Sequence, residues 1–189
     1  LLKFFFSSFL FFLPPSSRFD QLWLNEGFAT YVSYFPMEKL CPEFDVPTLS
    51  FIDDMSVAMR SDAFESTHPV QVDPNIRDPN EIMALIDNIT YSKGMAVLVM
   101  AYDFCGPERF RDGVSAYLRE FSFKNGSTKA LWNHLGCEKA MECWTRLVGF
   151  PVVHASWDAE KKTLSLRQER FLASGRFIDS EAWVINITV

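Results

Sequence analysis

The stretch DQLWLNEGFATYVSYF, residues 20–35, decides how this chain folds. Its apolar residues recur at helical spacing, which predicts an amphipathic helix with one buried face. That face is expected to carry Leu22, Trp23, Phe28, Val32 and Phe35. Pro36 is expected to end the helix, because proline has no N–H to donate inside an α-helix.

Downstream of this stretch the helical pattern continues. Asp78-Pro79-Asn80-Glu81 is typical of a helix start, with a cap acceptor, a proline at the first position and an acid at the third. Asn125-Gly126-Ser127 is expected to form a turn and a cap before another helix. Further helices are predicted over residues 48–60, 92–104, 108–121, 129–135 and 141–150, with a loop over 61–79.

After Gly149-Phe150-Pro151 the apolar period changes from helical to alternating. Residues 151–157 and 164–171 have the composition of strands, and residues 183–189 alternate as a half-buried strand does. The sequence therefore predicts an α+β chain, in which a mainly helical block over 20–150 precedes the start of a β domain over 151–189.

Composition restricts the class of protein. The chain has 189 residues, of which 48% are hydrophobic and 22% charged, as in a globular protein with a real core. Its formal net charge is −6, so it has no basic excess with which to bind a phosphate backbone, and we expect no nucleic-acid partner. Four cysteines without a C-x-x-C pair are too few for a disulfide scaffold.

Residues 1–19 differ from the rest of the chain. Seven of the 19 phenylalanines lie there, and the run LLKFFFSSFLFFL shows no regular period. It is too short for a membrane span, which needs about 20 apolar residues, so no transmembrane segment is expected. Two interpretations stay open, namely a secretory h-region and an artefact at a gene-model junction.

No complete catalytic motif appears. The three histidines His68, His134 and His154 do not pair at metal-binding spacing, and nucleophile-elbow and phosphate-loop motifs are absent from the sequence. Taken alone, Glu26 is typical of a solvated or capping residue and Tyr91 of a core residue.

Several segments nevertheless resemble, in order, the gluzincin zinc aminopeptidases of the membrane alanyl and puromycin-sensitive type. They are LWLNEGFATYVSYF, SDAFESTHPV, ITYSKGMAVLVM, LWNHLG, WTRLVGFPVV, RQERFL and WVINITV. The resemblance implies a partial thermolysin-like catalytic domain over 20–150, the truncated start of a β-sandwich over 151–189, and peptide substrates. Between Trp132 and Trp144 the family has several more residues, so a shortened connection is expected.

The resemblance also assigns two site residues. Glu26 stands where the family has its third zinc ligand, which would complete a His₂Glu site. Tyr91 stands where the family has a phenol that hydrogen-bonds the oxyanion of the tetrahedral intermediate. The implied cofactor is one zinc ion.

The family's H-E-x-x-H motif, which supplies two ligands and a general base, is missing. Counting back from Glu26 by the family spacing places its histidines at Lys3 and Ser7 and its base at Phe4. An ammonium repels zinc, a phenyl ring accepts no proton, and a neutral hydroxyl is a poor ligand. The chain alone is therefore expected to bind no zinc.

Two hypotheses follow. The chain is a fragment of a zinc aminopeptidase that releases N-terminal residues from peptides, or it is a non-catalytic relative that acts as a binding or interaction module. Its cysteines favour the cytoplasm, whereas the sequons at Asn88, Asn125 and Asn186 and the apolar start favour an exported or membrane-associated protein.

Overall fold

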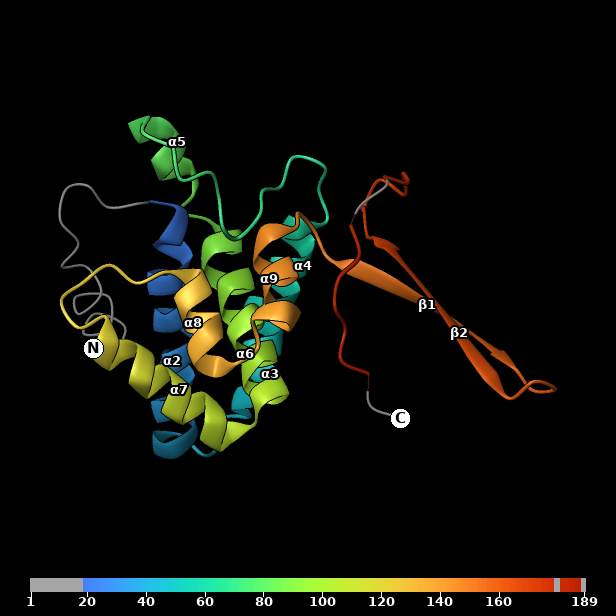
Figure 1. The fold of residues 1–189 in the computed structure, drawn as a ribbon, viewed down its shortest axis with the longest axis horizontal. Helices are drawn as coiled ribbons and strands as arrows, with labels where there is room; N and C mark the ends of the chain where they lie inside the picture. The colour runs from blue at the N-terminus through green and yellow to red at the C-terminus, as the bar shows by residue number, and fades with distance from the viewer. Residues whose placement is uncertain (1–18, 179–180, 188–189) are drawn as a thin grey trace.

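The computed structural model describes residues 19–178 and 181–187. A body of packed helices is followed by a β-hairpin that projects from it (Figure 1). The helices are η1 (Phe19–Gln21), α2 (Leu22–Leu40), α3 (Val46–Ser50), η2 (Phe51–Met55), α4 (Ser56–Asp62), α5 (Pro79–Ala84), η3 (Ile89–Lys93), α6 (Gly94–Cys105), α7 (Pro107–Glu120), α8 (Thr128–Leu135) and α9 (Glu138–Arg146). The strands are β1 (Pro151–Asp158) and β2 (Thr163–Arg170). This arrangement confirms the predicted α+β class.

Helix α2 differs from its prediction in two ways. Its first half is buried on every side, since all of residues 23–31 are buried, while Phe35 on the predicted inner face is 47% exposed. The helix also continues through Pro36 to Leu40. Pro36 leaves the carbonyl of Val32 without its usual helical donor, and Val32 is half-buried.

The other helices follow their local signals. The Asp78 side chain accepts from the backbone N–H of Asn80 at 2.8 Å with Pro79 in the first turn, as predicted. The Ser127 hydroxyl accepts from the N–H of Ala130 at 3.2 Å. The run predicted over 48–60 is continuous from α3 to α4, with one π-helical turn, η2, in its middle.

The hydrophobic core lies where α2, α6, α8 and α9 meet. Trp23 and Trp132 are each 1% exposed, and their ring centroids lie 5.8 Å apart. The Trp23 indole N–H donates to the Thr128 hydroxyl at 2.9 Å, which satisfies a buried polar atom and joins α2 to α8. Helices α8 and α9 are connected by Gly136 and Cys137 alone, and Gly136 has the positive φ (+64°) that such a tight connection needs.

Strands β1 and β2 form a two-stranded antiparallel hairpin in which Trp157 pairs with Leu164. The strand predicted over 183–189 is not observed in the described residues 183–187. The Gln168 side chain explains the difference, because its amide takes both backbone bonds of Trp183 (2.8 and 2.9 Å) that a partner strand would form. The β-sandwich beyond this hairpin stays a prediction.

The positions Lys3, Phe4 and Ser7 lie outside the described residues, as does the rest of the Phe-rich run. Within the described part of the chain, every helix is too short or too polar to cross a membrane.

Candidate functional site

Glu26 and Tyr91, the two site residues predicted from the sequence, lie next to each other in the structure. Glu26 is 8% exposed on α2, and Tyr91 is half-buried in the π-helical turn η3. Burial and then side-chain hydrogen bonding to the Glu26 carboxylate raise the pKa of Tyr91 to about 12. Like any tyrosine, Tyr91 is protonated at neutral pH, and its hydroxyl can serve as a hydrogen-bond donor.

A close approach of two glycines brings these side chains together. Gly27 directly follows Glu26, and Gly94 lies three residues after Tyr91. A Cβ added to Gly27 would come within 3.0 Å of the carbonyl carbon of Gly94. The backbones of α2 and of the first residue of α6, directly after η3, are therefore in van der Waals contact beside the site, which only residues without a side chain allow.

The N-terminal end of η3 is fixed by Asp87. One Asp87 carboxylate oxygen accepts from the backbone N–H groups of Ile89 and Thr90 at 2.9 and 3.1 Å, as an N-cap does. The other lies 3.1 Å from His68 Nε2. The hydrogen bond to Asp87 raises the pKa of His68. Burial alone would raise the pKa of Asp87, but the bonds from His68 and from the two N–H groups together lower the pKa of Asp87 below its usual value.

Two further aspartates hold the side chains that follow Tyr91. Asp54 accepts from the Ser92 hydroxyl at 2.8 Å and from the Tyr34 hydroxyl at 2.5 Å, so it links η3 to α2. Asp62 lies 2.6 Å from the Lys93 ammonium, which also donates to the Gly149 carbonyl at 3.0 Å. This ion pair is buried, and desolvation lowers the pKa of Lys93 although Asp62 counteracts it.

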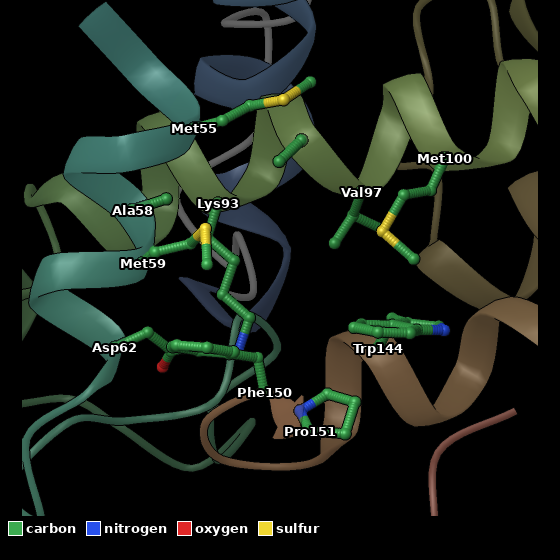
Figure 2. A pocket seen from close by; sticks show the side chains of 11 residues that line it. Met55, Ala58, Met59, Asp62, Lys93, Val97, Met100, Trp144, Phe150 and Pro151 are labelled. Atoms are coloured by element: carbon green, nitrogen blue, oxygen red, sulfur yellow. The ribbon is translucent and has the colours of Figure 1, made fainter. Parts of the chain in front are cut away.

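Lys93 and Asp62 also line a cavity between α4, α6 and α9 (Figure 2). The cavity has a volume of about 230 Å³, and its other walls are apolar. They include Met55, Met59, Met100, Trp144 and Phe150. Because both charged groups are paired with each other, the cavity presents no free charge to a polar substrate.

Comparison with known proteins identifies the chain. Residues 16–149 match the model of the peptidase family M1 domain, which is well over half of the chain. The chain belongs to peptidase family M1. The match spans the Glu26 and Tyr91 segments, so the two side chains that meet in the structure lie inside the M1 domain.

Relatives of this M1 chain are much longer than it is. It is 36% identical over 176 residues to tricorn protease-interacting factor F2 of Thermoplasma volcanium, covering 90% of this chain and 22% of that protein. It is 37% identical to aminopeptidase M1 of Arabidopsis thaliana, in a match that covers 89% of this chain and 19% of that protein. It is also 37% identical to mitochondrial aminopeptidase 2 of Saccharomyces cerevisiae, in a match that covers 82% of this chain and 17% of that protein. The M1 chain thus spans about a fifth of the length of these relatives.

Family M1 is generally zinc-dependent, and the residues that the structure describes offer one donor that fits the zinc site of the family. Glu26 supplies one hard, buried carboxylate, which suits zinc. No group of three His, Cys, Asp or Glu side chains close enough to hold a metal occurs within residues 19–178 and 181–187. Lys3 and Ser7 stand at the positions that the resemblance assigns to histidine ligands, and neither residue type completes a His₂Glu set.

Sequence reasoning missed the groups that support η3. Asp87 could have been found as a cap residue, because it stands two residues before a helical run. Lys93 carried a signal too, since it is the one charge in the run SKGMAVLVMA and a buried ammonium needs a partner. Asp54 and the pairing of Asp62 with Lys93 carried none, because these partners lie far apart in the sequence.

Proposed function

We propose that this chain is part of the catalytic domain of a zinc aminopeptidase that releases N-terminal residues from peptides. Glu26 is assigned as the third zinc ligand and Tyr91 as the donor to the oxyanion. The observation that carries the proposal is the meeting of these two side chains, the buried Glu26 on α2 and the half-buried Tyr91 in η3. The M1 family match and the aminopeptidase names of its relatives support the reaction class.

The Tyr91 hydroxyl supplies the chemistry that this chain itself can contribute. It hydrogen-bonds to Glu26 here, and the proposed role requires it to turn toward the developing oxyanion of a substrate carbonyl. Removing such a donor typically lowers the rate by about 10²–10³. A general base is not available at Phe4, so the chain as printed is proposed not to hydrolyse peptides.

Zinc binding tests the role of Glu26. We expect the purified chain to bind no stoichiometric zinc, and the variant Lys3→His/Phe4→Glu/Ser7→His to bind it, as measured by metal analysis after dialysis. Adding Glu26→Gln to that variant should weaken binding by about 10-fold or more, while Glu108→Gln on α7 should not. Equal zinc affinity with and without Glu26 would exclude it as a ligand.

A non-catalytic binding module is the second candidate. It is favoured by one observation, the residues Lys3, Phe4 and Ser7 at the positions assigned to the H-E-x-x-H motif. The intact mass of the native protein, captured with an antibody against residues 78–99, distinguishes the peptidase from the binding module. A mass several times 21.8 kDa supports the peptidase, and a mass near 21.8 kDa supports the module.

The cytoplasm is the compartment we propose. Support comes from the cysteines, all four of which are free thiols in the structure.

A further inference from the structure

Two of the free cysteines lie side by side, although they are distant in the sequence. Cys105 is the last residue of α6, and Cys137 is the cap residue that precedes α9. The Cys105 thiol lies 3.6 Å from the carbonyl oxygen of Leu135, two residues before Cys137. The Cys105 thiol is also near enough to contribute to the raised pKa of Cys137. The end of α6 and the start of α9 therefore bring the two cysteines close together.

We propose that Cys105 and Cys137 form a reversible intramolecular disulfide when the protein meets hydrogen peroxide or a small oxidised disulfide. Nothing in the peptidase site requires this pair. The inference is therefore independent of the function proposed above.

The surroundings give the two thiols different roles. Cys105 is half-buried and open to a small oxidant, whereas Cys137 is only 3% exposed. Burial raises the pKa of Cys137 to about 12, so Cys137 stays a thiol at neutral pH. The nearby Arg109 guanidinium partly opposes this shift and favours the thiolate when Cys137 reacts. Cys105 is thus the thiol that is oxidised first, and Cys137 is the one that resolves it.

The reaction with peroxide balances without any further reagent. The Cys105 sulfur attacks one peroxide oxygen, the O–O bond breaks, and a sulfenic acid and one water are formed. The Cys137 sulfur then attacks the Cys105 sulfur and displaces the hydroxyl, which leaves as a second water with the Cys137 proton. Two thiols are oxidised by two electrons and one peroxide is reduced to two waters. A reducing thiol reverses the bond by exchange.

The other two cysteines make no such contact. Cys143 donates to the Ala140 carbonyl at 3.3 Å and accepts from the N–H of Val184, so it faces the segment 181–187. Cys41 follows the end of α2. Both therefore serve as internal controls for the selectivity of oxidation.

The test is peptide mapping of the whole chain after oxidation under native conditions. The protein is treated with hydrogen peroxide, its remaining thiols are alkylated, and it is digested without reductant. We expect a Cys105–Cys137 cross-link, alkylated Cys41 and Cys143, and an intact mass about 2 Da lower before alkylation, which dithiothreitol restores. Cys105→Ser should lose the cross-link and the matched control Cys41→Ser should keep it.

Two results would overturn the proposal. One is alkylation of both Cys105 and Cys137 after a treatment that oxidises other thiols of the same chain. The other is a cross-link that joins Cys105 or Cys137 to Cys41 or Cys143 instead. Because the wild-type map alone decides the matter, a folding defect in a variant does not remove the test.

Discussion

Removing one partner of the buried Lys93–Asp62 ion pair should destabilise the whole helical body. The side chains of Lys93 and Asp62 are 7% and 2% exposed, so solvent screens their attraction little. In Lys93→Met the Asp62 carboxylate would stay buried, with the Thr67 hydroxyl as a donor at 3.1 Å and the Arg170 guanidinium, which acts on Lys93, as a remaining nearby cation. Removing the direct partner of a buried charge typically costs about 3–5 kcal/mol, which is a factor of roughly 150 to 5,000 in the folding equilibrium.

Urea unfolding followed by tryptophan fluorescence measures this cost. The matched control Thr67→Val removes a neutral bond to the same carboxylate and should cost only about 1 kcal/mol. The double variant Lys93→Met/Asp62→Leu removes both charges and should recover most of the loss, because an apolar pair in an apolar cavity needs no partner. A Lys93→Met chain within 1 kcal/mol of the wild type, or a double variant no better than the single, would refute this reasoning.

Other perturbations address the site and its supports. Glu26→Gln should lower the pKa of Tyr91 from about 12 toward 10 without reaching 10, because burial is the larger cause of the raised value. The pKa is measured from the NMR signals of the tyrosine ring as a function of pH. An unchanged pKa would show that Glu26 does not act on the phenol. The His68–Asp87 pair should stabilise the fold most between pH 3.8 and 6.5. Folding raises the pKa of His68, so its contribution to the free energy of unfolding is complete below pH 6.5 and is lost as the pH rises through the pKa of the folded state. Folding lowers the pKa of Asp87, so its contribution is complete above pH 3.8 and is lost as the pH falls through the pKa of the folded state. His68→Gln should therefore flatten the alkaline side of a plot of stability against pH, and an unchanged profile would contradict the assignment. Gly27→Ala should lower the free energy of unfolding by about 1–3 kcal/mol, because the added Cβ would lie 3.0 Å from the facing backbone carbon of Gly94. A melting temperature equal to that of the wild type would mean that the two backbones can move apart without cost.

The helices that the sequence predicted well are those with local signals. The caps at Asp78 and Ser127 act within three residues of themselves, so their pattern is complete in the sequence. Pro36 misled because a proline disfavours a helix interior without excluding it, and here α2 continues for four residues beyond Pro36. The strand expected at Trp183 failed because the Gln168 side chain occupies its backbone groups.

The site shows the same division. Glu26 and Tyr91 were predicted from a resemblance, and the structure brings them together, but their roles stay predictions. No spacing in the sequence indicates that Asp54 joins Ser92 to Tyr34, because this carboxylate bridges segments from three parts of the chain.

Contacts among the described residues hold the two segments that carry the assigned site residues. The segment that carries Tyr91 is held at its start by Asp87, and beyond it by Asp54 and Asp62. The segment that carries Glu26 is held against it by a backbone contact at Gly27. All of these contacts are made among described residues. Placing histidine, glutamate and histidine at positions 3, 4 and 7 therefore tests whether this arrangement of Glu26 and Tyr91 accepts a zinc ion.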